Sequence, residues 1–205
     1  MPACSKFPPM KLSPRRAIFW EAAMPSWARI ATRLRVPLGF FLSAAYLWFA
    51  HPAAIWMVAG GAFIVAGLAL RAAASGHIRK NRELTTTGAY AYTRNPLYLG
   101  SVLIAAGFVM AARNLWIALA AVLMFVVIYM PVIRAEEKYL RSNFPGFDAY
   151  AASVPRFFPR LHAFRAGAAA GFSRELYMRH REYNAALGSM LMMGALIVKI
   201  LLVRQ

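Results

Sequence analysis

Long apolar stretches alternate with short polar ones along most of this chain. Five stretches are apolar enough to be membrane-spanning helices, near residues 36–50, 53–70, 97–112, 115–133 and 185–203. Only His51-Pro52 separates the first two and only Arg113-Asn114 separates the next two, so each pair is expected to form a tight helical hairpin. The pattern predicts an all-α fold, a multi-pass transmembrane bundle of about five helices.

The polar segments divide the chain into four parts. These are a basic N-terminal segment (1–35), a membrane core (36–160), a connector (161–184) and a C-terminal transmembrane helix (185–205). In the first part, Ser26 can cap a short helix with Trp27, Ile30 and Leu34 on one face and basic residues on another. Such a helix suits the surface of an anionic lipid leaflet, and an ordinary helix packed on the protein fits the same pattern.

Composition and charge also indicate a membrane protein. Of the 205 residues, 60% are apolar and 15% are charged, whereas about a quarter are charged in soluble domains. The net charge of +17 does not indicate a nucleic-acid partner, because a soluble basic domain would not carry these apolar runs. The three long polar segments hold 21 Lys and Arg residues, against 3 at the hairpin tips and the C-terminal end. We therefore expect the N-terminus and the active site on the cytoplasmic side, in a prokaryotic inner membrane.

The first polar stretch of interest, "LTTTGAYAYTRNPLYLG", spans residues 84–100. Asn95-Pro96 has the form of a helix start, because Asn can accept bonds from the first free amides and Pro fits the first turn. The positive end of that helix suits an anion such as a carboxylate or phosphate. Aromatic faces that can hold a cation surround it, from Tyr90, Tyr92 and Tyr98. A capped transmembrane helix with interfacial tyrosines fits the same residues.

The second stretch, "VIRAEEKYLRSNFPGFDAYAASVPRFFP", spans residues 132–159 and holds two of the seven acidic residues side by side, Glu136 and Glu137. The fourth helix is expected to continue through Leu140, so at least one glutamate faces back toward the bundle. A carboxylate there can bind ribose hydroxyls or an ammonium group. The alternative is an ion pair with a neighbouring base such as Arg134, contributing under about 1 kcal/mol if exposed.

Together the two stretches resemble a known family. The first is similar to its pattern of Leu, a few residues, Gly-x-Tyr and Arg-His-Pro-x-Tyr-x-Gly, and "EEKYLRSNFPGFDAYAASVP" is similar to its Glu-Glu-x-x-Leu, Phe-Gly, Tyr, Val-Pro continuation. These patterns are typical of the isoprenylcysteine carboxyl methyltransferase and phospholipid methyltransferase superfamily, integral membrane enzymes that use S-adenosylmethionine. The resemblance covers roughly residues 55–160.

The resemblance implies a site. The positions where the family binds S-adenosylmethionine correspond to Leu84, Tyr90, Asn95, Pro96, Leu97, Tyr98, Glu136 and Glu137, and relatives place a further polar contact near Lys80. An arginine near the glutamates contacts substrate in the family, and Arg134 is the nearest here, so Arg134 and Glu137 are the implied catalytic residues. Asn95 stands where the family has histidine. It can still cap a helix but it cannot titrate near neutral pH.

The implied function is methyl transfer from S-adenosylmethionine to a lipophilic or small acceptor: an isoprenylcysteine-like carboxylate, a lipid amine or a thiol. The acceptor would enter from the bilayer between spans, where small residues at four-residue spacing allow close packing, namely Ala62 and Ala66, Ser101 and Ala105, and Gly107 and Ala111. Two alternatives stay open. One is a membrane ene or sterol-type reductase using NADPH, and the other is a non-enzymatic membrane bundle.

Metal chemistry is not expected. The single cysteine, Cys4, and the four histidines make no ligand pair at metal spacing. His77 lies near the first stretch and can serve as an acid or base. Residues 173–184 read as a capped basic helix that either covers the site or rests on lipid headgroups.

Overall fold

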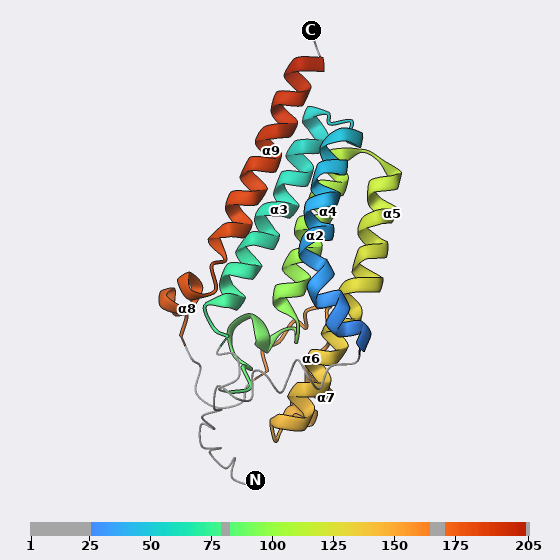
Figure 1. Ribbon diagram of the computed structural model, residues 1–205. Helices are drawn as coiled ribbons and strands as arrows, with labels where there is room; N and C mark the ends of the chain where they lie inside the picture. The colour runs from blue at the N-terminus through green and yellow to red at the C-terminus, as the bar shows by residue number, and fades with distance from the viewer. Residues whose placement is uncertain (1–25, 79–82, 165–170, 204–205) are drawn as a thin grey trace.

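The computed structural model describes residues 26–78, 83–164 and 171–203. Throughout these residues the regular structure is helical, which confirms the all-α fold. Figure 1 labels the helices in chain order: α2 (Ser26–Phe49), α3 (Ala54–Ser75), the short 3-10 helix η1 (Gly88–Ala91), α4 (Pro96–Ala112), α5 (Leu115–Met124), the π-helical turn η2 (Phe125–Tyr129), α6 (Met130–Asn143), α7 (Phe147–Ser153), α8 (Arg174–Arg179) and α9 (Tyr183–Val203).

The bundle has the dimensions of a membrane protein. Three helices are long and apolar enough to cross a bilayer, Ala54–Ser75, Leu115–Asn143 and Tyr183–Leu202, and two shorter apolar helices, Val36–Phe49 and Pro96–Ala112, run beside them. Large apolar side chains point outward along them, for example Trp48, which is 80% exposed. Such a surface suits contact with lipid chains rather than water. These five apolar helices correspond to the five expected spans, and three of them have the length and composition of a membrane-crossing helix.

The N-terminal part of the bundle differs from the expected short helix on the membrane surface. Ser26–Phe49 is one helix, so the segment of Trp27, Ile30 and Leu34 is the first part of the helix whose apolar stretch is Val36–Phe49. The indole Nε1 of Trp27 donates to the carbonyl of Val127 at 3.1 Å. That carbonyl lies four residues before Pro131, which has no N–H to offer it, and Trp27 supplies the missing donor.

Glycines set the closest helix contact of the bundle, between α3 and α4. A Cβ atom on Gly60 would overlap the carbonyl oxygen of Gly107, and one on Gly67 would lie 2.6 Å from that of Gly100. Close backbone approach through small residues is the usual packing device between membrane helices. The expectation of such packing was right for Gly107 and wrong for Ala62 and Ala66, which are exposed on the outer face of α3.

Polar groups tie the two hairpin tips together. The Asn114 side chain accepts bonds from the first amides of α5 and donates to the carbonyl of Phe49 at 2.9 Å. The His51 amide donates to the carbonyl of Ala112 at 2.8 Å. Lys199 Nζ donates to the last carbonyls of α2 at 2.7 and 2.9 Å, so it satisfies free carbonyl groups at a helix end.

The fourth span continues beyond its apolar part, as expected, and reaches Asn143. The π-helical turn inside it was not expected from the sequence. It stacks Phe125 on Tyr129, and it places Tyr129 edge-on to Tyr98 with ring centroids 6.1 Å apart. A π-turn widens a helix locally and is common near functional sites.

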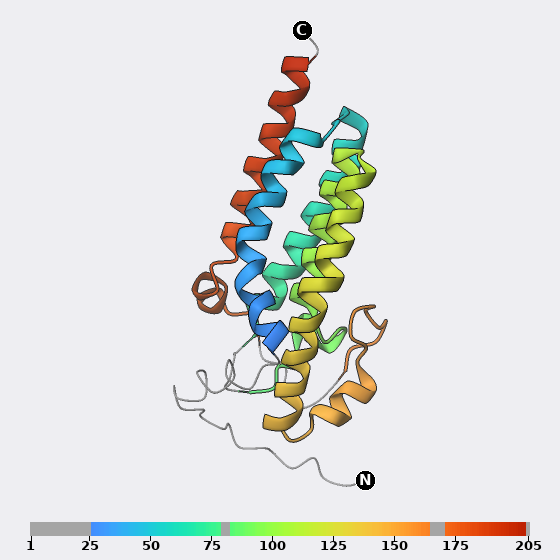
Figure 2. The same ribbon diagram turned by 45° about the vertical axis from the view of Figure 1, so that its right-hand side comes forward.

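The polar segments gather at one end of the bundle. In Figures 1 and 2, η1, α7 and α8 lie at this end, while the two hairpin tips lie at the other, beside the C-terminal part of α9. The distribution of basic residues predicts this arrangement.

Candidate functional site

The two polar stretches meet directly. The Asn95 side-chain amide donates to Glu137 Oε1 at 3.2 Å, across 42 residues of sequence. The Tyr150 hydroxyl donates to the carbonyl of Tyr90 at 2.7 Å in a buried contact. The start of α4 is therefore joined to both α6 and α7, and the residues singled out from the sequence belong to one region.

Asn95 stands before α4 as expected, but its side chain makes no capping bond. Instead Nδ2 donates both to Glu137 and to the carbonyl of Arg156, the latter at 3.3 Å. Asn95 is only 8% exposed, so its buried amide needs acceptors, and the Glu137 carboxylate and the Arg156 carbonyl provide them. Pro96 occupies the first helical turn, as the sequence predicts.

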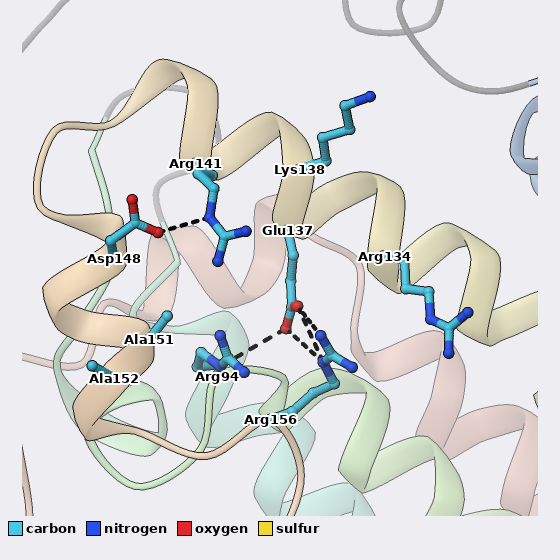
Figure 3. Close-up of a pocket in the computed structure, with 9 residues that line it drawn as sticks. All are labelled: Arg94, Arg134, Glu137, Lys138, Arg141, Asp148, Ala151, Ala152 and Arg156. Atoms are coloured by element: carbon cyan, nitrogen blue, oxygen red, sulfur yellow. Dashed lines mark hydrogen bonds and ion pairs between the residues drawn. The ribbon is translucent and has the colours of Figure 1, made fainter.

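Glu137 is the centre of an ion cluster, shown in Figure 3. Arg156 donates to both of its carboxylate oxygens through Nε at 3.0 and 3.1 Å and through Nη2 at 2.6 Å. Arg94 Nε lies 3.8 Å from Oε1. The hydrogen bond with Glu137 raises the pKa of Arg156 above its ordinary value. Since the Glu137 side chain is 12% exposed, these partners compensate the charge of a nearly buried carboxylate.

Residues 155–164 run beside the first polar stretch, a feature that the sequence patterns did not reveal. The Arg94 amide donates to the Pro155 carbonyl at 2.9 Å, and the Arg160 amide donates to the Tyr92 carbonyl at 3.0 Å. Leu84 packs against the buried group of Phe147, Tyr150 and Val154. Backbone pairing of this kind depends on the fold and leaves no periodic pattern in the sequence.

Tyr90, in η1 of the first polar stretch, is buried, with 7% of its surface exposed. Burial raises the pKa of its hydroxyl above the ordinary value, and the negative charge of Glu136 raises it further. Glu182 acts in the same direction and Arg71 in the opposite one. The adjacent glutamates therefore have different surroundings: Glu136 acts on Tyr90, and Glu137 is held by arginines. Helix geometry explains this, because successive residues are about 100° apart.

Arg71 and Glu182 complete the group around Tyr90, and the sequence reasoning missed both. Arg71 Nε and Nη2 donate to the Glu182 carboxylate at 2.9 and 3.0 Å, in a paired arrangement across 111 residues. Nη1 of Arg71 donates to the Ser101 hydroxyl and to the Leu97 carbonyl in the first turns of α4. The available signal was an arginine near the end of an otherwise apolar span, which usually marks a functional position.

The segment around α8 lies over the end of α3. The Ser173 amide donates to the Gly76 carbonyl at 2.9 Å, and His180 Nδ1 lies 3.2 Å from the Ser75 carbonyl. The Phe172 ring lies edge-on to His77, with centroids 6.1 Å apart. Ser173 caps α8, as expected. These contacts join the segment to the end of α3.

The remaining implied residues divide into three groups. Leu97 and Tyr98 are partly buried in the first turn of α4, beside Arg71 and Tyr129. Arg134 is exposed and lines an open cavity that Glu137 also lines. Lys80 lies outside the described residues. Within the described ranges, no three His, Cys, Asp or Glu side chains come together in a way that would hold a metal ion.

Comparison with known proteins agrees with this architecture. Residues 53–146 match the family described as phospholipid methyltransferase. The matched part, 94 of the 205 residues, is similar to a family of the isoprenylcysteine and phospholipid methyltransferase superfamily. The match includes both the Asn95-Pro96 turn and the two glutamates.

Two curated relatives resemble 87 residues of the chain. Over 87 residues the chain is 42% identical to the nickel-cobalt-cadmium resistance protein NccN of Alcaligenes xylosoxydans xylosoxydans and 40% identical to the cobalt-zinc-cadmium resistance protein CzcN of Cupriavidus metallidurans. Each alignment covers 42% of this chain, and it spans 41% and 40% of the two relatives respectively. No solved structure matches the chain.

Proposed function

We propose that this protein is an integral membrane methyltransferase that moves a methyl group from S-adenosylmethionine to a lipophilic or small acceptor. One observation carries the proposal. At the polar end of a bundle that matches a methyltransferase family, Tyr90 is buried and bonded to Tyr150, and Arg71 pairs with Glu182 beside the start of α4. A buried aromatic ring among opposite charges is a suitable environment for a zwitterionic, cationic cofactor.

The side chains in this region fit the groups of S-adenosylmethionine one by one. The carboxylate of its methionine part matches the positive end of α4 and the guanidinium of Arg71. Its ammonium group or ribose hydroxyls match the carboxylate of Glu136. The sulfonium centre matches the faces of Tyr90 and Tyr98. Asn95 and Glu137 support the site from behind, by fixing the start of α4 against α6.

Methyl transfer of this kind requires the protein to position the reactants and does not require a protein nucleophile. S-adenosylmethionine, when bound, supplies an electrophilic methyl group. The protein residues then have to bind, orient and exclude water. Tyr90 is protonated at neutral pH, as an ordinary tyrosine is, and burial raises its pKa further, so it offers a neutral ring and hydroxyl. Arg134, at the edge of the same region, is the proposed contact for an anionic acceptor group.

The acceptor is proposed to come from the bilayer. The group around Tyr90 lies directly beyond the ends of α3 and α4, where a water-soluble donor can meet a lipid-borne acceptor. An isoprenylcysteine-like carboxylate, a lipid amine and a thiol all fit this arrangement. With the basic segments inside, the site would face the cytoplasm of a prokaryotic inner membrane.

The test is calorimetric titration of the purified full chain in detergent with S-adenosylmethionine. We expect saturable binding that weakens about ten-fold or more in Glu136→Gln, because a charged hydrogen bond contributes about 1.5–3 kcal/mol. The matched control, Arg174→Gln, removes an exposed charge on α8 and should bind normally.

Two further titrations decide between this proposal and its alternatives. NADPH binding without S-adenosylmethionine binding would replace the methyltransferase with a reductase. Binding of Ni²⁺ or Cd²⁺, the ions in the names of the relatives, without S-adenosylmethionine binding would replace it with a metal-handling role. We expect neither.

A further inference from the structure

A second polar feature includes Glu137 in its lining. It is an open cavity of about 800 Å³ between α6, α7 and the segment that follows α7. Its charged lining consists of five cationic side chains and two carboxylates: Arg94, Arg134, Lys138, Arg141, Arg156, Glu137 and Asp148. The excess of three positive charges in one concave surface favours an anion.

Both carboxylates of this cavity are already engaged. Glu137 is held by Arg156, Arg94 and Asn95, and Asp148 accepts a bond from Arg141 at 2.7 Å. They therefore do little to neutralise the other cations. The repulsion that they would exert on a bound anion is reduced by the same arginines.

Three cations retain unused capacity toward a ligand. Arg134 and Lys138 are exposed, come from successive turns of α6, and have no carboxylate partner among the described residues. In Figure 3 both extend away from Glu137. Arg94 Nε is buried and has no hydrogen-bond acceptor, since Glu137 at 3.8 Å is too distant. An unsatisfied buried guanidinium nitrogen beside a basic cavity indicates a missing acceptor.

The position of the cavity along the bundle fits the headgroup layer. Trp27 bonds to Val127 and is 46% exposed, as an interfacial tryptophan would be. Arg134 lies seven residues after Val127 in the same helical span, which is about 10 Å at the helical rise per residue. This is close to the depth of lipid headgroups, and a long arginine side chain spans the difference.

The segment after Arg156 returns toward the apolar part of the bundle. Phe157 packs edge-on against Phe125 in the π-turn, with centroids 5.7 Å apart. Phe158 and Leu161 follow with 87% and 92% of their surfaces exposed. Exposed apolar side chains beside a basic cavity are typical of proteins that bind both the chains and the headgroups of lipids.

We propose that this cavity binds the phosphate group of an anionic phospholipid. Arginine guanidinium groups and a lysine ammonium group are the usual partners of phosphate oxygens. The apolar side chains next to the cavity favour a lipid-borne phosphate over a soluble one. The proposal concerns binding, and its test needs no methyl transfer, although Arg134 and Glu137 line this cavity and are also among the residues of the proposed methyltransferase site.

The experiment measures the thermal stability of the full chain in neutral detergent. The probes are short-chain phosphatidylglycerol, short-chain phosphatidylcholine and inorganic phosphate, each titrated separately. We expect a saturable rise in melting temperature with phosphatidylglycerol, at concentrations at least ten-fold below those at which the other two act.

Two double variants identify the site. Arg134→Gln with Lys138→Gln should weaken the phosphatidylglycerol effect about ten-fold or more. Arg174→Gln with Arg179→Gln removes two exposed charges from α8 and should leave the effect of phosphatidylglycerol on the melting temperature unchanged. Equal losses in both double variants would overturn the proposal in favour of diffuse charge attraction. Equal effects of phosphatidylcholine, or of inorganic phosphate at the same concentration, would overturn the assignment to an anionic lipid.

Discussion

The adjacent carboxylates Glu136 and Glu137 allow a matched pair of substitutions, Glu136→Gln and Glu137→Gln. Both remove one negative charge from the same helical turn and keep nearly the same side-chain shape. We expect them to affect different properties. Glu137 holds α6 to the start of α4 through Arg156 and Asn95, whereas Glu136 acts on Tyr90.

The size of the stability effect follows from the contacts of Glu137. A hydrogen bond to a charged group contributes about 1.5–3 kcal/mol when it is well buried. The Glu137 side chain is 12% exposed but that of Arg156 is 38% exposed, so solvent reduces the contribution. We expect Glu137→Gln to cost about 2 kcal/mol. For a chain of this size that corresponds to a melting temperature roughly 4–8 °C lower.

The assay compares melting temperature in detergent with S-adenosylmethionine affinity for the same two variants. Glu137→Gln should melt earlier, and Glu136→Gln should melt as wild type but bind the cofactor about ten-fold more weakly or worse. The reasoning would be refuted if Glu137→Gln kept the wild-type melting temperature while Glu136→Gln kept the wild-type affinity.

Four further substitutions test the packing and the polar end. Gly60→Ala should destabilise the bundle by about 1–3 kcal/mol because its Cβ meets the Gly107 carbonyl, while Gly61→Ala, with open space around it, should be neutral or stabilising by up to about 1 kcal/mol in denaturation. Burial raises the pKa of Tyr90 in the folded state, so the contribution of its protonated hydroxyl to folding stability is complete below pH 10 and is lost as pH rises further. Tyr90→Phe should therefore make the fall in folding stability at alkaline pH less steep, by about 1.4 kcal/mol per pH unit. Glu182→Gln breaks the ion pair with Arg71 and should speed amide hydrogen exchange in α8. Unchanged exchange would show that this pair does not hold the α8 segment against α3.

The sequence predicted the spans and hairpins well because they depend on local properties. A run of apolar residues long enough for a bilayer, broken by His51-Pro52 or Arg113-Asn114, leaves few alternatives for the backbone. The same holds for the start of α4 at Pro96 and for the extension of α6. Each of these features is decided by neighbours within a few turns.

The polar contacts of the candidate site depend on residues that are distant in the sequence. Nothing in the sequence near Asn95 indicates that its side chain would bond to Glu137 rather than cap its own helix. The pairing of Arg71 with Glu182 joins positions 111 residues apart. The length of the first helix was also misjudged, because the basic residues after Ser26 resemble a surface helix although the backbone continues without a break.

The central claim is that the polar end of this bundle transfers methyl groups from S-adenosylmethionine. The most direct measurement is incorporation of labelled methyl from S-adenosylmethionine into the lipid and protein fractions of membranes that contain the full chain. We predict a labelled product that appears with wild type and with Arg174→Gln and that falls at least ten-fold with Glu136→Gln. Equal labelling with wild type and with membranes that lack the protein would contradict the claim.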